Sequence, residues 1–420
     1  MNARELALDL LNRWPQSRAL ADELLEQALA GSSLGESDRA FVTELFYGCL
    51  RQQLALRFLQ SRLATRPPRP IVANILTLGL YQLFYLKTPA HAAVHETVAL
   101  AKTRAGDAEA KFVNAVLRRA DREQEQLRAA LEATRETEPW IHYSHPEWLW
   151  NRWAAQFGRE NAAALCEWNN QPPPVFIRIN TLKANGKPAD VAAEPTDHPL
   201  GWRATNAAGL FQTKSFLNGE FYVQDPSTLM AVDVLDPQPG ESVLDMCAAP
   251  GGKTTYIGQK MQNRGRIIAA DSTSSRLALV GENCRRLGVT IAATLACEGT
   301  RLDHCLRGEE FDRVLVDAPC SNTGVIRRRA DLRWRIEEKE ITRLASLQIK
   351  LLGSAAKFTK RGGVLVYSTC SLEREENEGV TETFLAAHTG FTMEATRSLF
   401  PPRDRMDGAF VARLRRTSAA

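Results

Sequence analysis

Apolar residues in the first third of the chain recur at helical spacing. From Asn2 to about Arg135 they return every three or four positions, as in the series Phe41, Leu45, Leu50, Leu54 and Phe58. Prolines mark where new helices open, at Pro67, Pro68, Pro70 and Pro89. No strand-like alternation interrupts the stretch, so the pattern predicts an all-α N-terminal domain of about five to seven helices over residues 1–136.

The pattern changes in the segment 137–236. It holds five of the eight tryptophans, at Trp140, Trp148, Trp150, Trp153 and Trp168, which are more typical of packing than of stacking on bases. Val175–Asn180 and Phe221–Val223 are strand-like, whereas 187–201 is rich in proline and glycine and predicts a loop. We expect a small mixed α/β middle subdomain here.

From residue 237 onward, short apolar strands alternate with helical patterns. The strand-like segments are Ser242–Asp245, Arg266–Ala270, Arg313–Val316 and Gly363–Tyr367. This alternation predicts a Rossmann-like α/β domain with a mostly parallel sheet over 237–420. Ligands of such sheets bind off the carboxyl ends of the strands, so functional residues are expected there.

Composition limits the class of protein but does not identify a function. A chain of 420 residues exceeds one hydrophobic core, and 44% apolar with 24% charged residues is ordinary for a soluble globular protein. The net charge of +4 is a faint sign of an anionic partner, and the eight cysteines form no C-x-x-C pair of a zinc ribbon or thioredoxin site. The longest apolar run, Ile71–Leu86, is short for a membrane span and contains Asn74, so we expect a buried helix and a cytoplasmic protein.

A glycine pair follows the first strand of the sheet. The expected ligand loop comprises Cys247, Ala248, Ala249, Pro250, Gly251, Gly252 and Lys253. Two adjacent glycines let the backbone approach a ligand, and the next helix aims its N–H groups at it. A phosphate-binding P-loop fails because its first glycine is replaced by Cys247, and G-x-G-x-x-G is absent. The sequence therefore predicts a cofactor loop of another kind, against the plainer alternative of a simple turn.

Two acids follow later strands. Asp271 ends the second strand, 20 residues beyond Gly251, where a carboxylate can accept hydrogen bonds from both ribose hydroxyls. Glu298 follows the apolar segment 291–296 and is placed to reach an adenine amino group. A solvated loop carboxylate is an equally good interpretation of Glu298.

Two cysteines lie just past strand ends. Cys320 stands in Asp317-Ala318-Pro319-Cys320-Ser321-Asn322-Thr323-Gly324, and Cys370 in Ser368-Thr369-Cys370-Ser371. One such cysteine is as often a packing residue as a reactive one. Two at matching strand ends favour covalent chemistry. Their spacing does not decide which of them attacks.

These motifs together resemble the NOL1/NOP2/Sun family of RNA cytosine-C5 methyltransferases, and within it the bacterial RsmB (Sun/Fmu) branch. The helical N-terminal region is similar to a NusB-type RNA-binding domain, and 224–227 and 407–412 fit as well. The resemblance implies S-adenosylmethionine as methyl donor, small-subunit ribosomal RNA as partner, and a target of the cytosine 967 type in 16S rRNA. It also implies an RNA-binding role for the middle subdomain.

The resemblance also implies residue roles. Cys370 becomes the nucleophile, Cys320 assists release, and Asp317 reads the ring nitrogen and amino group. Expected cofactor contacts are Cys247, Ala248, Ala249, Pro250, Gly251, Gly252, Lys253, Asp271, Arg276, Glu298 and Asp317. Glu298 stands where the family has Asp, and the segment after Asp271 lacks a further acid, so the fine geometry of the cofactor site departs from the family pattern.

A run of arginines follows the Cys320 loop. Its members are Arg327, Arg328, Arg329, Arg333 and Arg335, with Trp334 among them. Such a run suits phosphate clamping and base stacking, and we expect it to bind RNA; a solvated basic helix face is the alternative. His91 and His95 share a helix face, but without H-E-x-x-H order or a third ligand we expect no metal. We further expect no membrane contact and a monomer.

Two other functions compete with the methyltransferase. A non-catalytic RNA-binding assembly factor is disfavoured by the intact Cys320, Cys370 and Asp317. A DNA cytosine methyltransferase attacks with a thiol that follows proline. The additional cysteine after Thr369 and the RNA-type N-terminal region disfavour that reading.

Overall fold

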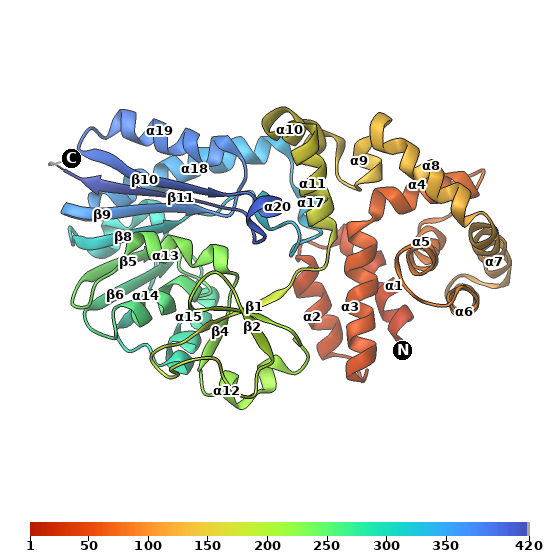
Figure 1. Ribbon diagram of the computed structural model, residues 1–420, viewed down its shortest axis with the longest axis horizontal. Helices are drawn as coiled ribbons and strands as arrows, with labels where there is room; N and C mark the ends of the chain where they lie inside the picture. The colour runs from red at the N-terminus through yellow and green to blue at the C-terminus, as the bar shows by residue number, and fades with distance from the viewer. Residues whose placement is uncertain (418–420) are drawn as a thin grey trace. The chain divides into compact units, whose positions relative to one another are not determined.

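The computed structural model describes residues 1–417 and divides into two compact units (Figure 1). The helical unit comprises Met1–Pro172 together with Ile326–Arg335. The α/β unit comprises Pro173–Val325 and the chain from Ile336 onward. This division differs from the three segments expected from the sequence, whose boundaries stay a prediction.

The helical unit holds more helices than the sequence pattern suggested. Within the described residues, eight α-helices precede residue 138: α1 (Ala3–Arg13), α2 (Ala21–Ala30), α3 (Glu36–Arg51), α4 (Gln53–Leu63), α5 (Pro70–Tyr85), α6 (Ala90–Ala105), α7 (Asp107–Arg122) and α8 (Gln124–Thr137). The expectation of five to seven was wrong because a single residue, Gln52 or Glu123, separates α3 from α4 and α7 from α8. The apolar periodicity runs across such breaks with no proline or glycine to mark them.

The tryptophan-rich segment continues the helical unit. It forms α9 (Pro139–His142), α10 (Glu147–Phe157) and α11 (Arg159–Asn170). Trp153 is fully buried, and Trp150 stacks on Tyr143 with ring centroids 5.4 Å apart. Packing, as expected, is the role of these two tryptophans.

The apolar run at 71–86 lies almost wholly in α5. Its side chains Ile75, Leu76, Leu78 and Leu80 are fully buried in the core of the helical unit. Of the helices in residues 1–417, none is long and apolar enough to cross a membrane.

The α/β unit begins with a small antiparallel sheet of order β2-β3-β1-β4. Its strands are β1 (Val175–Ile179), β2 (Ala193–Pro195), β3 (Gly201–Ala204) and β4 (Phe221–Val223). β1 and β4 confirm the two expected strands. β2 lies inside the segment expected to be loop, because a three-residue edge strand ending in Pro195 has too little alternation to be recognised.

The larger sheet has seven strands in the order β10-β11-β9-β8-β5-β6-β7. They are β5 (Ser242–Met246), β6 (Arg266–Asp271), β7 (Ala292–Ala296), β8 (Phe311–Asp317), β9 (Thr359–Thr369), β10 (Phe391–Leu399) and β11 (Ala409–Arg416). Strands β7, β6, β5, β8 and β9 pair in parallel, while β11 and β10 add on antiparallel. The expected mostly parallel, Rossmann-like sheet is confirmed.

Helices cover both faces of this sheet (Figure 1). α13 (Met230–Leu235), α14 (Gly252–Lys260) and α15 (Ser274–Leu287) lie on one face, and α18 (Glu338–Lys357) and α19 (Glu378–Ala387) on the other. Alternate strand residues feed the two cores: Val243 packs with α13 and α14, whereas Leu244 packs with α18. Shorter turns of helix are α12 (Lys214–Leu217), α16 (Asp303–Leu306), α17 (Leu332–Arg335) and α20 (Pro401–Asp404).

One buried arginine ties the small sheet to the start of α14. The guanidinium of Arg178, on β1, donates to Gln224 Oε1 at 2.6 Å and to the Gly252 carbonyl at 2.8 Å. It lies 5.4 Å from the ring centroid of Tyr222 and 4.9 Å from that of Tyr256. Burial lowers the pKa of Arg178 to about 10. The small sheet thereby fixes the glycine turn from which α14 begins.

Candidate functional site

Most of the residues predicted to bind the cofactor and to carry the catalysis lie at the carboxyl ends of β5, β6, β8 and β9. Asp271 is the last residue of β6 and Asp317 the last of β8. Cys320 and Cys370 follow the ends of β8 and β9 in neighbouring loops. All of them belong to the α/β unit.

The glycine turn requires its glycine at Gly251. The φ of Gly251 is +101°, and a Cβ there would lie 3.1 Å from Val280 Cα. A Cβ on Gly252 would lie 3.1 Å from the Tyr222 ring. Ala248 N–H donates to the Ala270 carbonyl at 2.9 Å, which fixes the turn between β5 and α14. Glycine is therefore required at Gly251 by its positive φ and by its packing against α15.

Asp271 anchors the same turn. Its carboxylate is 4% exposed and accepts from Ala249 N–H at 3.3 Å and from Thr273 N–H at 3.1 Å. Arg276 contacts both Asp271 and Ala249. Its Nη1 lies 3.4 Å from Asp271 Oδ1, and its Nη2 donates to the Ala249 carbonyl at 3.0 Å. Two carboxylate oxygens are thus held in fixed directions, as ribose hydroxyls require.

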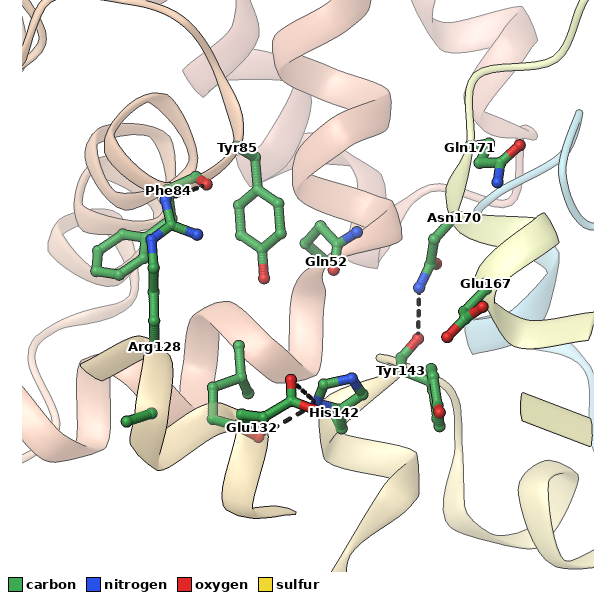
Figure 2. A pocket seen from close by; sticks show the side chains of 12 residues that line it. Gln52, Phe84, Tyr85, Arg128, Glu132, His142, Tyr143, Glu167, Asn170 and Gln171 are labelled. Carbon is green, nitrogen blue, oxygen red and sulfur yellow. Dashed lines mark hydrogen bonds and ion pairs between the residues drawn. The ribbon is translucent and has the colours of Figure 1, made fainter. Parts of the chain in front are cut away.

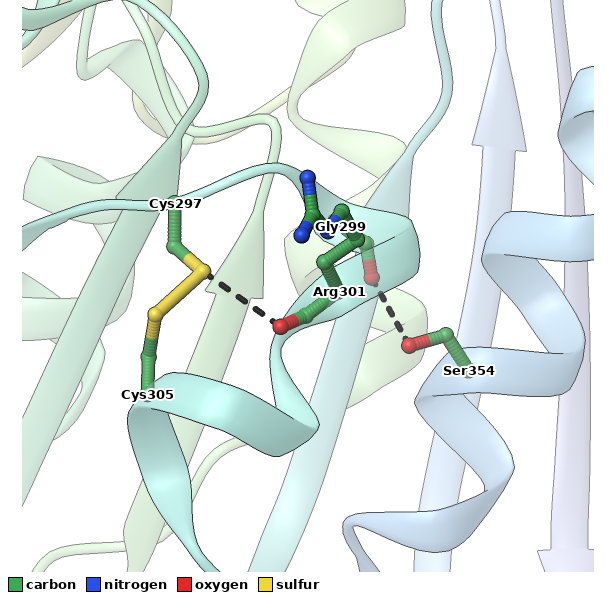
Figure 3. The surroundings of a disulfide bond; sticks show 5 residues. All are labelled: Cys297, Gly299, Arg301, Cys305 and Ser354. Carbon is green, nitrogen blue, oxygen red and sulfur yellow. Dashed lines mark hydrogen bonds between the residues drawn. A yellow bond between two sulfur atoms is a disulfide. The ribbon is translucent and has the colours of Figure 1, made fainter.

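Glu298 lies in a loop that a disulfide closes. Cys297 and Cys305 are bonded, and Ser354 Oγ on α18 donates to the Gly299 carbonyl at 2.7 Å (Figure 3). The sequence analysis did not identify this pair, since a separation of eight residues is not a recognised motif. Glu298 itself is exposed, and its adenine contact stays a prediction.

Lys253 reaches across to Asp317. Its Nζ lies 2.7 Å from Asp317 Oδ2, with the lysine side chain 15% exposed. Burial alone would lower the pKa of Lys253, but the Asp317 carboxylate raises it above its ordinary value. A fixed cation and a carboxylate therefore stand side by side between the glycine turn and the cysteines.

The two cysteines are in contact. Their Sγ atoms lie 3.4 Å apart, and Cys370 Sγ donates to Asn322 Oδ1 at 3.0 Å. Cys320 is buried at 8% exposure, whereas Cys370 is partly exposed. The hydrogen bond to Cys370, together with burial, raises the pKa of the Cys320 thiol. The pair therefore holds one enclosed sulfur, whose thiol pKa is raised, next to one more accessible sulfur.

Sequence reasoning missed two side chains that shape this pair. Asn322 has a φ of +59°, and its Nδ2 donates to the Cys320 carbonyl at 2.8 Å while its Oδ1 faces Cys370. Glu376 is fully buried and bonds to Ser321 and Ser371. Asn322 was visible inside the Cys320 motif, but Glu376 stands in a charged run that reads as solvent-exposed.

Asp245 is a buried carboxyl with one unsatisfied oxygen. Thr254 Oγ1 donates to its Oδ2 at 2.6 Å, while Oδ1 has no hydrogen-bond partner among the described residues. Burial raises the pKa of Asp245 to about 7; the nearby carboxylates of Asp317 and Asp271 act in the same direction. The folded protein therefore favours the neutral acid.

We expect Asp245→Asn to change the pH dependence of stability. A folded pKa above the ordinary 3.8 adds stability that is complete below pH 4 and is lost as pH rises through 7. The shift corresponds to roughly 4 kcal/mol between those limits. Melting temperatures from pH 4 to 9 should show the variant gaining on the native protein up to about pH 7 and keeping that gain at higher pH. Parallel curves would show that Asp245 does not titrate in this range.

The arginine run lies in the helical unit, and most of its arginines donate hydrogen bonds to groups of that unit. Arg333 is fully buried, and its guanidinium donates to Asn170 Oδ1 at 2.7 Å and to the Asn169 carbonyl at 2.9 Å. Burial lowers its pKa to about 9. This corrects the expectation that Arg333 clamps a phosphate, because no face of it is accessible.

Arg327 and Arg335 also bind main-chain carbonyls. Arg327 is 8% exposed, donates to the Pro172 carbonyl at 2.8 Å, and lies 4.1 Å from the Trp168 ring centroid. Arg335 donates to the Ala19 carbonyl at 2.8 Å. Arg327 is buried by these contacts, whereas Arg335 is partly exposed and its RNA contact stays a prediction. Arg328 and Arg329 are partly and well exposed, and their RNA contact stays a prediction.

A pocket of about 580 Å³ opens in the helical unit (Figure 2). Tyr85 and Arg128 stand on one side and His142 on another, while Asn170 Nδ2 donates to the Tyr143 carbonyl at 2.7 Å. None of the candidate cysteines or cofactor residues lines it. Across residues 1–417, no group of three or more His, Cys, Asp or Glu is placed to hold a metal ion.

Three family models match the chain. A model described as 16S rRNA methyltransferase RsmB/F matches residues 232–415. The NusB family model matches residues 1–122. A ferredoxin-like domain model of RsmF/B-like methyltransferases matches residues 145–192.

Curated relatives and solved structures agree with these models. A probable ribosomal RNA small subunit methyltransferase B of Bacillus subtilis is 37% identical, over 93% of this chain and 89% of its own length. A crystal structure of PH0851 is 25% identical with a TM-score of 0.80, covering 99% of both chains. NSun6 from Pyrococcus horikoshii, crystallised with SFG, is 25% identical with a TM-score of 0.60, covering 65% of this chain and 99% of its own.

Proposed function

Because this chain belongs to the RsmB/F family of ribosomal RNA methyltransferases, we propose that it transfers a methyl group from S-adenosylmethionine to carbon 5 of a cytosine in small-subunit ribosomal RNA. The target is of the cytosine 967 type in 16S rRNA, and the reaction passes through a covalent adduct between a cysteine and carbon 6. RNA is the partner, the protein acts as a monomer in the cytoplasm, and no metal takes part.

The residues around the glycine turn fit S-adenosylmethionine. Gly251 fixes the turn into α14 through its positive φ, and Asp271 offers two oriented oxygens to a ribose. SFG, the ligand in the NSun6 structure, is an analogue of S-adenosylmethionine. When bound, this cofactor supplies an electrophilic methyl group on a sulfonium. Cys247 to Lys253, Asp271, Arg276, Glu298 and Asp317 are the proposed contacts.

The cysteine pair can make carbon 5 of cytosine nucleophilic enough to accept a methyl group. That carbon is a weak nucleophile, and addition of the Cys370 thiolate at carbon 6 turns the ring into an enamine-like nucleophile. We assign to Asp317, which pairs with Lys253, the binding of the ring nitrogen and amino group. Once the methyl group is on carbon 5, water takes up the carbon-5 proton with the help of Cys320, and the electrons of the broken carbon–hydrogen bond expel the sulfur from carbon 6, which returns the Cys370 thiolate. The base must leave any stack to reach these groups.

The observation that carries the proposal is the asymmetry of the pair. At 3.4 Å, Cys320 is close enough to exchange a proton with Cys370, and the hydrogen bond to Cys370 together with burial raises the pKa of the Cys320 thiol. Cys370 is the more accessible sulfur. The geometry therefore supports Cys370 as the attacking group and Cys320 as the group that assists release.

The reaction itself is tested by product analysis. The protein is incubated with S-adenosylmethionine and unmodified small-subunit rRNA, and the RNA is digested and its nucleosides separated by mass. We expect 5-methylcytidine at one position, and no product on DNA of the same sequence. Methylation at a nitrogen would contradict the proposed chemistry. RNA binding with no methyl transfer would favour the non-catalytic assembly factor.

A further inference from the structure

A single buried carboxylate connects the two cysteine loops. Glu376, at the end of the short helix Arg374–Glu376, is 0% exposed. Its Oε1 accepts from Ser321 N–H at 2.9 Å, and its Oε2 accepts from the Ser371 hydroxyl at 2.5 Å. The Ser321 hydroxyl also donates to Oε2. Ser321 directly follows Cys320, and Ser371 directly follows Cys370.

A third element joins this contact. Gln348, on α18, donates through Nε2 to Glu376 Oε1 at 3.0 Å and to the Pro319 carbonyl at 2.9 Å. An anion removed from water is costly unless several donors surround it. Glu376 has four such donors, from two loops and one helix, so the loops cannot separate without leaving a buried carboxylate short of partners.

The pairing of β8 with β9 ends before the cysteines, so other contacts hold the two loops together. The β8–β9 register ends at the Asp317–Ser368 pair, before either cysteine. Beyond it, Gly324 N–H donates to the Cys370 carbonyl at 2.9 Å, and Leu372 N–H donates to Thr323 Oγ1 at 2.9 Å. The first of these bonds holds Cys370 itself, and Cys370 Sγ also donates to Asn322 Oδ1. The Ser321 and Ser371 hydroxyls lie 3.1 Å apart, and Glu376 binds both of these serines, next to the two sulfurs.

We propose that Glu376 is a positioning residue that sets the distance between the Cys320 and Cys370 sulfurs, through its bonds to Ser321 and Ser371. Its consequence for methyl transfer rests on the proposed function; its effect on the sulfur–sulfur distance does not. Within residues 1–417, Glu376 makes no hydrogen bond to either sulfur. It acts on the pair through the two serines, and its charge also raises the pKa of the Cys320 thiol.

The sulfur–sulfur distance can be measured without RNA or cofactor. The fully reduced protein is treated with diamide, and the disulfide between Cys320 and Cys370 is followed by peptide mass. Two S–H bonds break, one S–S bond forms, and the two hydrogens reduce the N=N bond of diamide. The Cys297–Cys305 pair closes in the same sample and serves as an internal control.

We expect Glu376→Gln to slow closure of Cys320–Cys370 by about tenfold, with the Cys297–Cys305 rate unchanged. The exposed neighbour Glu375→Gln is the matched control and should behave as the native protein. In methylation assays, the kcat of Glu376→Gln should fall by roughly a hundredfold, with the KM for S-adenosylmethionine unchanged. Ser371→Ala, which removes one hydroxyl and keeps the carboxylate, covers the case in which Glu376→Gln does not fold, and should give a smaller slowing of closure.

Native closure of Cys320–Cys370 in folded Glu376→Gln would overturn the proposal, even if methylation were lost. For Ser371→Ala, native closure would do the same. If the native protein methylates no RNA but the variants slow closure, the positioning role stands and the proposed function fails.

Discussion

Cys370→Ala is expected to abolish methyl transfer while leaving the cofactor site intact. Without the thiolate, carbon 6 has no partner and carbon 5 remains too weak a nucleophile for a sulfonium methyl. Loss of an attacking group lowers kcat by about 10⁴-fold or more. Cys370 does not bond to the glycine turn or to Asp271, so the affinity for S-adenosylmethionine should stay native. Single-turnover assays with labelled donor measure the rate, and calorimetry measures the affinity.

A matched control separates the chemistry from packing. Cys284 is a buried thiol on α15 of the same unit, at 7% exposure, and Cys284→Ala should retain activity near the native rate. If Cys370→Ala kept more than about a tenth of the native rate, Cys370 would not be the nucleophile.

Cys320→Ala is expected to stop the reaction at a later stage. The adduct on Cys370 still forms, because the attacking sulfur is untouched, but the group 3.4 Å away that assists proton loss and release is missing. Methylated RNA should then remain attached to the protein. We expect turnover to fall by roughly 10³-fold and a protein–RNA complex to survive a denaturing gel.

The double variant decides whether that complex is the expected one. Cys320→Ala combined with Cys370→Ala should give no complex, since the attachment point is gone. A complex that persists in the double variant would mean that another side chain attacks. A Cys320→Ala protein that turns over normally would remove Cys320 from the mechanism.

The fold and the site could be predicted from the sequence where the hydrophobic pattern of a segment and the chemistry of its residues indicate the same structure. Strand runs such as Val243-Leu244 alternate between two buried faces, so the parallel sheet could be recognised, and the order of strands placed Asp271, Asp317 and both cysteines at one edge. Gly251 was recognisable because its backbone conformation excludes side chains. Short breaks at Gln52 and Glu123 were not, because nothing in their chemistry ends a helix.

The remaining features depend on contacts between distant segments. Arg333 looks like a phosphate ligand until the carbonyl of Asn169, 164 positions away, is found beside it. Glu376 looks solvated until Ser321, 55 positions away, supplies its donors. In both cases a charged side chain is buried because distant polar groups satisfy it, and hydrophobic patterning carries no trace of that.

The central claim is that Cys370 attacks carbon 6 while Cys320 assists release. 5-Fluorocytidine in place of cytidine blocks loss of the carbon-5 substituent, so the adduct accumulates in the native protein. The protein is incubated with S-adenosylmethionine and 5-fluorocytidine-substituted small-subunit rRNA, digested, and the nucleotide-bearing peptide sequenced by mass spectrometry. We predict that the methylated nucleotide is attached to Cys370. Attachment to Cys320, with the adduct surviving in Cys370→Ala, would contradict the account.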